Sequence, residues 1–445
     1  MNQDAIYDAR QLGVPKMLLL GLQHMFAMFG ATILVPAITG LSISATLLFA
    51  GLGTLLFHLI TGRKVPAFLG SSFAFLGAYG LVTASGAEIP LTYSSFGVAC
   101  AGLLYLVLAL LFKVFGAQKV MRYFPPIVTG PVIIAIGLTL SQSAIDSCGK
   151  NWLVALVAIL VVIIFNIWGK GMLKIIPILL GVVASYVFSM IVDAPTRATL
   201  VKHVSQAAWI GLPVKWENTA LSIFGNNFDG GMLVTAIITI MPIALATMVE
   251  HIGDICAISS TVEKNFVSDP GLHRTLTGDG MATTIAALFG APANTTYGEN
   301  TGVLALSKVY DPRVIRLAAV FAVILSFCPK FAAIIGAMPA ATIGGVSLVL
   351  YGMISAVGVR NVVENQVDFT KSRNVLIAAL ILVLSIGIKY SAAGAITFHV
   401  ASFTISLSGL AVGALVGIVM NAVLPGKDYE FQKDDEGSTS VNFKV

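Results

Sequence analysis

Uninterrupted apolar runs of about 20 residues recur along this whole chain, and they constrain its fold more than any other feature. A helix of that length crosses the hydrocarbon core of a bilayer, which is about 30 Å thick. Only 11% of the residues are charged, whereas soluble domains carry about 25%. Backbone groups within lipid must be hydrogen-bonded inside the segment, so each run is expected to be helical. The sequence therefore predicts an all-α polytopic membrane protein whose solvent is the lipid bilayer.

We predict fourteen transmembrane segments with short connections, except for a long polar outer loop at about 194–231. Connections rich in Lys and Arg alternate along the chain with connections that have few of them. The connections rich in basic residues lie on the same side as both termini. By the positive-inside rule both termini, including an acidic tail over 426–445, are cytoplasmic in a multi-pass protein of the inner or plasma membrane. The predicted segments are 16–37, 43–61, 66–84, 92–113, 125–142, 152–168, 173–193, 232–259, 275–290, 294–307, 314–329, 338–356, 374–389 and 404–424.

Three short motifs recur in the same order and with similar spacing in the two halves of the chain. Seven segments per half is an odd number, so a duplication places the halves in the membrane with opposite orientation. This is the 7+7 inverted repeat of secondary transporters. The matching pairs are Gln23-His24 with Glu250-His251, residues 71–75 with residues 295–299, and Phe124-Pro125 with Met338-Pro339.

The third and tenth segments are interrupted by proline and glycine at corresponding places. Pro66 and Gly70 lie in the third segment; Pro292 lies just before the tenth segment, and Gly298 lies within it. Discontinuous segments of this kind form the midplane substrate site of inverted-repeat transporters. We expect a short extended strand in each, followed by a half-helix.

Three carboxylates lie at membrane depth. Glu250 and Asp254 are four residues apart and therefore share a helix face, and Glu299 lies in the tenth segment. Charge in a bilayer costs several kcal/mol, so such residues are functional candidates; the alternative is that they cap helix ends or bond to Ser and Thr. A desolvated carboxylate can hold a proton and can also bind the N–H and C=O edge of a heterocycle. His251 and its repeat mate His24 are expected to orient neighbouring groups.

Phe73 and Tyr297 occupy equivalent positions in the two interrupted segments. Across a pseudo-two-fold axis they would sandwich a flat ring. The alternative is ordinary packing, which is the commoner role of aromatic residues in membrane segments.

These motifs together resemble the nucleobase–ascorbate (nucleobase–cation symporter-2) family over nearly the whole chain, and within it the uracil branch. Ser307 stands where the family signature usually has threonine. The stretches that carry the resemblance are residues 23–30, 66–75, 250–253 and 294–308.

The resemblance implies two domains and a homodimer formed through the second of them. Residues 1–113 and 232–331 would form a core domain, and residues 114–231 and 332–425 a gate domain. Glu250 and Glu299 would bind the base, with backbone hydrogen bonds at Phe73 and Gly298. Ser72 and Tyr351 complete the predicted substrate site, and Glu250, Asp254, Glu299, His251 and His24 form the predicted proton-coupling set.

Two positions disagree about the substrate. Uracil carriers of the family often have His where this chain has Asp254, and xanthine carriers commonly have Asp there. Glu299, in contrast, matches the uracil branch. Because Glu299 is the direct contact, the resemblance favours import of uracil with protons over transport of xanthine or another purine.

Three other functions remain as alternatives. An anion exchanger on the same fold would need a fixed cation at the site, and a passive channel would show no coupling. A membrane enzyme would need a metal or nucleophile cluster, for which Asp269, His273, Arg274 and Asp279 come closest. No nucleotide-binding loop or metal pattern is present, so we expect no cofactor, with protons as the coupling ion, and no nucleic-acid partner.

Overall fold

The computed structural model describes residues 5–83, 90–225, 228–400 and 403–426, which are mostly helical. The predicted cytoplasmic tail therefore lies outside the described residues, apart from Gly426. The principal helices are α1 (Val14–Thr39), α2 (Ile43–Ile60), α3 (Leu76–Thr83), α4 (Pro90–Phe115), α6 (Pro126–Cys148), α7 (Trp152–Trp168), α9 (Pro177–Val192), α10 (Ala194–Gln206), α11 (Gly230–Ile240), α12 (Ala244–Val262), α13 (Leu272–Leu288), α14 (Gly298–Ser307), α15 (Pro312–Ser326), α16 (Pro329–Gly336), α17 (Ala340–Glu364), α18 (Ser372–Lys389) and α19 (Gly409–Val423).

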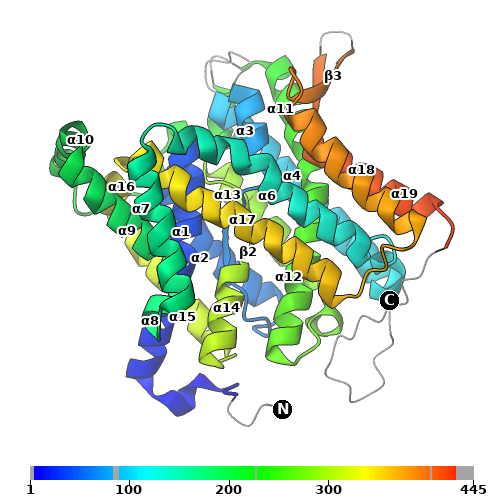
Figure 1. The fold of residues 1–445 in the computed structure, drawn as a ribbon, viewed down its shortest axis with the longest axis horizontal. Helices are drawn as coiled ribbons and strands as arrows, with labels where there is room; N and C mark the ends of the chain where they lie inside the picture. Colours follow the sequence, from blue (N-terminus) through cyan, green and yellow to red (C-terminus); the bar gives the residue numbers. More distant parts are fainter. Residues whose placement is uncertain (1–4, 84–89, 226–227, 401–402, 427–445) are drawn as a thin grey trace.

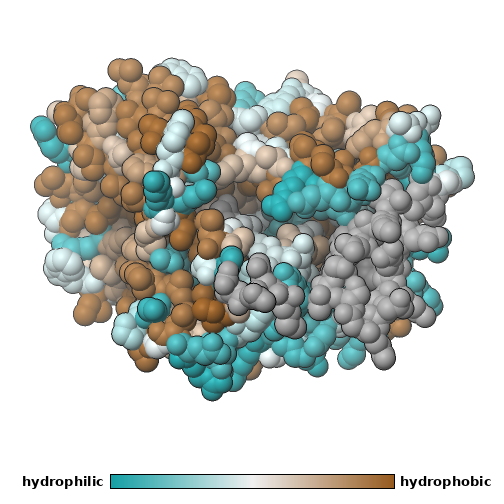
Figure 2. Space-filling model, turned by 60° about the horizontal axis from the view of Figure 1, so that its bottom comes forward, coloured by the Kyte–Doolittle hydropathy of each residue, from teal (hydrophilic) through white to brown (hydrophobic). Residues whose placement is uncertain are grey.

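The helices make this a multi-pass membrane protein. Among the described residues, seven helices are long and apolar enough to cross a bilayer, and nine if each of two sharply bent pairs counts as one span. Figure 2 shows hydrophobic side chains over much of the visible face, with hydrophilic ones gathered along its lower edge. The number of fourteen segments remains a prediction, because several of them are short or broken helices here.

Glycines let two pairs of helices, α6 with α17 and α4 with α13, cross in close contact. A Cβ atom on Gly358 of α17 would lie 2.7 Å from the Gly130 carbonyl oxygen of α6, and one on Gly280 of α13 would lie 2.7 Å from the Gly102 carbonyl oxygen of α4. Without a hydrophobic force between helices in lipid, close packing of small residues is the main source of attraction. The two crossings fix the scaffold around the centre of the molecule.

Two short strands meet at that centre. β1 (Leu69–Ser71) pairs antiparallel with β2 (Asn294–Thr296), with Gly70 opposite Thr295. α3 follows β1 in the chain, and α14 follows β2 after the single residue Tyr297; β2 lies near the middle of Figure 1. Extended backbone at membrane depth is tolerated because all three residues of each strand are buried in protein and pair with each other.

One helix and a pair of strands in the structure were not predicted. The region predicted as a polar loop begins with the helix α10, and a hairpin of β3 (Ala395–Val400) and β4 (Phe403–Ser408) precedes α19. Our prediction of a loop from residue 194 was wrong because it used polarity alone. Pro195 in the first turn favours the start of a helix, and an exposed helix needs no apolar run.

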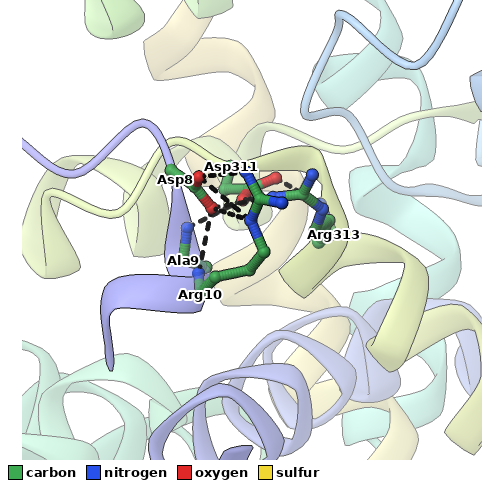
Figure 3. A network of polar contacts seen from close by, with 5 residues as sticks. All are labelled: Asp8, Ala9, Arg10, Asp311 and Arg313. Atoms are coloured by element: carbon green, nitrogen blue, oxygen red, sulfur yellow. Dashed lines mark hydrogen bonds and ion pairs between the residues drawn. The ribbon is translucent and has the colours of Figure 1, made fainter. Parts of the chain in front are cut away.

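The residues before α1 are attached to the loop between α14 and α15. Ile6 and Tyr310 join through a hydrogen bond from the Tyr310 amide to the Ile6 carbonyl (2.8 Å), and the Tyr7 hydroxyl donates to the Val262 carbonyl at the end of α12 (2.9 Å). Figure 3 shows the ionic part of this attachment, which we call the N-terminal network.

The N-terminal network joins Asp8 and Arg10 to Asp311 and Arg313. The Ala9 amide donates to Asp311 Oδ2 (2.8 Å), Arg313 Nη1 lies 2.8 Å from Asp8 Oδ1, and Arg10 Nη2 lies 2.6 Å from Asp8 Oδ2. Hydrogen bonds from Arg10, and the positive charges of Arg10 and Arg313, hold the pKa of Asp8 well below its ordinary value.

A pH-dependent contribution to stability follows from this lowered pKa. A carboxylate that is more acidic when folded stabilises the protein above its unfolded pKa, and that contribution is lost as the pH falls through the folded pKa. We expect the detergent-solubilised Asp8→Asn protein to melt below wild type at pH 7, with the difference shrinking below about pH 4, the ordinary range for Asp. Thermal unfolding curves at several pH values measure this. A difference that is independent of pH would contradict it, and Glu217→Gln, which alters an exposed carboxylate elsewhere, is the control.

Candidate functional site

A cavity of about 210 Å³ lies beside the crossing of β1 and β2. Its wall combines residues from the two interrupted segments and α12 with apolar residues of α6 and α17. The lining residues are Phe73, Ile133, Glu250, Asp254, Thr295, Thr296, Tyr297, Gly298, Met353, Ile354 and Val357.

The acidic side of the cavity comes from one face of α12. Glu250 and Asp254 both line it and are half-buried, whereas the intervening Ile252 and the adjacent His251 are buried on the opposite face. The Thr296 hydroxyl donates to Asp254 Oδ2 at 2.6 Å, which ties α12 to β2. The four-residue spacing thus places both carboxylates toward the same space, as the helical period requires.

The aromatic residues predicted to flank a ring both reach the cavity. Phe73 follows β1, and Tyr297 lies between β2 and α14. The Tyr297 hydroxyl donates to the Ser71 carbonyl (2.9 Å) and accepts from Thr32 (3.3 Å), so its ring is fixed by polar contacts away from the space it borders.

The tenth segment contributes the start of a helix. Gly298, the first residue of α14, lines the cavity, and a Cβ atom there would meet nothing within 4 Å. The amino end of a helix carries partial positive charge and N–H groups without helical partners. Glu299 follows in the first turn of α14, but its side chain lies outside the described part of the structure.

Ser72 and Tyr351 do not line the cavity. Ser72 is buried, and its amide donates to the Ala293 carbonyl (2.8 Å). Tyr351 is buried behind Phe73, with the two rings edge to face and their centroids 5.5 Å apart. The structure therefore places Tyr351 where it supports a ring that borders the cavity.

The two histidines predicted to assist are buried away from the cavity. His251 Nδ1 lies 2.9 Å from Asp279 Oδ2 of α13, with both side chains fully buried. His24 on α1 lies 3.2 Å from the side-chain amide of Asn300 on α14. Each histidine thus joins a helix that carries site residues to a neighbouring helix.

The cluster considered for a membrane enzyme does not form in the structure. Asp279 is in the protein interior with His251, whereas Asp269 is exposed and forms an ion pair with Lys64 at 2.5 Å. The described residues contain no group of three or more His, Cys, Asp and Glu placed to hold a metal ion.

Sequence reasoning missed the apolar wall formed by Ile133, Met353, Ile354 and Val357. Ile133 lies on α6, and the other three residues lie on α17. Apolar residues on a membrane helix carry no signal that separates lipid-facing, packed and cavity-lining positions.

The arrangement suits a small, flat, polar molecule. Two carboxylates accept hydrogen bonds from N–H groups, and each can donate one when protonated. The N–H groups at the start of α14 donate hydrogen bonds to carbonyl oxygens. Phe73 and Tyr297 offer apolar surface to the faces of a ring. A neutral heterocycle with its own donors and acceptors fits these groups better than an anion, which two carboxylates would repel.

Sequence comparison relates the chain to a large group of transport proteins. The permease family matches residues 15–394. The uracil permease of Bacillus caldolyticus is 40% identical over 438 residues, covering 96% of each chain. The uracil permease of Escherichia coli K12 is 35% identical, covering 91% of this chain and 90% of that one.

Two solved structures share the fold at low sequence identity. The transmembrane domain of the cyanobacterial bicarbonate transporter BicA superposes with a TM-score of 0.56 at 14% identity, covering 94% of this chain and 99% of that one. SLC26A9 gives a TM-score of 0.60 at 13% identity, covering 94% of this chain and 66% of that one. At such identities the likeness concerns the fold alone.

Proposed function

Because this chain belongs to the permease family, we propose that it imports uracil across the cell membrane by symport with protons. The chain is a transporter and not an enzyme. Near-full-length relatives that are named uracil permeases support the substrate. The observation that carries the proposal is the cavity itself, which Glu250 and Asp254 line together with Phe73 and Tyr297.

Glu250 and Glu299 bind the N–H and C=O edge of the base, while Phe73 and Tyr297 cover its faces. Backbone groups at Phe73 and Gly298 complete the hydrogen bonds. This role of Glu299 rests on the family resemblance.

Proton coupling follows from the proximity of carboxylates in a desolvated place. Two negative charges one helical turn apart repel each other and are costly within a bilayer. A proton on Glu250 or Asp254 removes one charge and supplies a donor for a carbonyl oxygen of the base. The proton and the base then each raise the affinity for the other, because linkage is reciprocal. His251 and His24 act indirectly by holding α12 and α14 in place.

The inverted repeat is supported by the register of the central strands. The repeat mates of Gly70 and Ser71 are Asn294 and Thr295. In the structure Gly70 pairs with Thr295 and Ser71 with Asn294. Exchanging every residue for its repeat mate converts one of these pairs into the other, as a two-fold axis through the crossing requires. This symmetry favours two halves of opposite orientation, with an odd number of segments in each and both termini on the same side of the membrane.

The packing of the helices supports a division into core and gate. α2 packs against α13 and α15, and α4 against α13, all within 1–113 and 232–331. α6 packs against α17, and α18 against α19, within 114–231 and 332–425. The cavity lies between the groups, since Glu250 and Phe73 belong to the core and Ile133 and Met353 to the gate. We propose that the core moves against the gate during transport, and that two gate domains join in a homodimer.

Radiolabelled uracil uptake into proteoliposomes with an imposed inward proton gradient tests the proposed function. We expect accumulation above equilibrium that a protonophore abolishes and that excess unlabelled xanthine does not reduce. Strong inhibition by xanthine would instead indicate a purine carrier, which is the second candidate function. Asp254 is the residue that this chain would share with such carriers. Uracil equilibration without accumulation would contradict symport, and liposomes without protein give the background.

A further inference from the structure

The chain turns sharply after α9. α9 and α10 are separated only by Asp193, and their axes differ by 112°. The Thr196 hydroxyl donates to Asp193 Oδ2 at 2.5 Å and fixes the turn. The seventh predicted segment, 173–193, ends with α9, so a helix whose axis differs from that of α9 by 112° runs across the end of this segment and does not prolong it. Figure 1 shows α10 at the upper left edge of the molecule, away from the amino terminus.

The segment that follows α10 is held against the bent pair α15–α16. The Lys330 amide donates to the Ala208 carbonyl (3.1 Å), and the Gly211 amide donates to the Phe327 carbonyl (3.1 Å). Lys330 Nζ donates to the Val204 carbonyl (2.7 Å) and lies 5.1 Å from the centre of the Trp209 ring. These contacts hold the backbone of residues 204–211 against α15 and α16. The exposed side chains in this stretch are therefore kept at the surface by the fold.

Large apolar side chains project from this segment. Trp209 is 74% exposed, Ile210 84%, Leu212 81% and Trp216 69%. Surfaces of this kind in soluble proteins mark interaction sites. In this protein the segment follows α9 closely. The last residue of α9, Val192, is also exposed, as expected for a side chain that contacts lipid. Tryptophan is enriched where hydrocarbon meets lipid headgroups, because its ring is apolar and its N–H is polar.

The charge of the segment has one sign. Residues 194–216 contain Arg197, Lys202 and Lys215 and no Asp or Glu. Arg197 and Lys202 are exposed on α10. Basic residues beside exposed Trp and aliphatic side chains are typical of elements that lie in the interface of an anionic bilayer.

We propose that residues 194–216 form a membrane-interface anchor. Trp209, Ile210, Leu212 and Trp216 enter the headgroup region of the leaflet opposite the amino terminus, and Arg197 and Lys202 bind the phosphate groups of anionic phospholipids there. The anchor holds the end of α9 and the α15–α16 bend at one level of the bilayer. This inference needs only a chain that spans the membrane and is independent of the transported molecule.

Tryptophan fluorescence in proteoliposomes tests the anchor, because the chain has only four tryptophans. In full-length Trp152→Phe/Trp168→Phe protein, the signal comes from Trp209 and Trp216. We expect lipids brominated near the headgroup end of the acyl chain to quench at least half of this emission, and lipids brominated near the methyl end to quench less. The Trp209→Phe/Trp216→Phe protein, which reports on the ends of the membrane helix α7, is the positive control for quenching.

Quenching by external iodide with no response to brominated lipids would overturn the proposal, because it would place Trp209 and Trp216 in water. Insensitivity to both quenchers, with emission that changes with protein density in the vesicles, would assign the surface to a second copy of the chain and would also overturn it.

The charged part of the anchor is tested by lipid composition. We expect the melting temperature of wild type to be higher in phosphatidylglycerol than in phosphatidylcholine vesicles, and the Arg197→Gln/Lys202→Gln protein to lose at least half of that increment. Lys150→Gln, which removes an exposed charge outside the segment, keeps the full increment. An unchanged increment in the double variant would overturn the assignment of Arg197 and Lys202 to lipid phosphates.

Discussion

Replacement of Glu250 by glutamine is expected to abolish proton-driven accumulation of uracil and to lower its initial uptake at least about 10-fold. Glutamine has nearly the same volume and keeps one oxygen acceptor, but it cannot take up a proton or carry a negative charge. A hydrogen bond to a charged group contributes about 1.5–3 kcal/mol, equivalent to roughly 10- to 150-fold in affinity. Loss of the carboxyl group that takes up the proton has a second effect: the proton gradient can no longer drive accumulation of the base.

Two measurements separate these effects. Initial uptake under an inward proton gradient reports coupling, and exchange of labelled for unlabelled uracil without a gradient reports binding and movement alone. We expect the Glu250→Gln protein to lose all accumulation and to retain slow exchange. Normal pH-driven accumulation would refute the proposed role of Glu250.

The matched control is Glu364→Gln at the end of α17. The chemical change is the same, but Glu364 is 58% exposed and forms a surface ion pair with Arg360. Exposed pairs of this kind contribute less than about 1 kcal/mol, so uptake should remain near that of wild type.

Gly358→Val is expected to cost on the order of 3 kcal/mol of stability, the upper range for overpacking, and to reduce the yield of folded protein. A Cβ atom at Gly358 would lie 2.6 Å from the Ile134 amide nitrogen and 2.7 Å from the Gly130 carbonyl oxygen. Both are backbone atoms of α6, so no side-chain rotation relieves the clash and the helices must separate. Thermal unfolding of the purified protein in one detergent measures the loss.

Gly352→Val supplies the comparison on the same helix. A Cβ atom at Gly352 would meet nothing within 4 Å, yet the change in helix propensity is the same as at Gly358. We expect its melting temperature to stay close to wild type. Equal losses in the two variants would show that propensity, and not the contact of α6 with α17, determines the effect.

Several features could be predicted from short stretches of sequence. Apolar length specified membrane helices, because hydrocarbon leaves few other ways to satisfy the backbone. The four-residue spacing of Glu250 and Asp254 specified a shared face, and both residues line the cavity. The motifs around Glu250 and Tyr297 also identified the family, which the match over residues 15–394 confirms.

Contacts between distant parts of the chain could not be predicted. The pairing of His251 with Asp279 and the position of Tyr351 behind Phe73 depend on how whole helices pack. The helix α10 was missed because its exposed polar residues resemble those of a loop.

The sequence by itself therefore determined that the chain lies in a lipid bilayer, that it is built mainly of helices, and that one face of α12 carries two carboxylates. These features depend on the length, period and polarity of short stretches. Only the tertiary structure decided which residues enclose the cavity and where residues 194–216 lie. Phe73, Glu250 and Met353 come from three elements far apart in the chain, and an apolar side chain carries no local signal for its distant partner. The pairing of β1 with β2, more than 200 residues away, brings the site together.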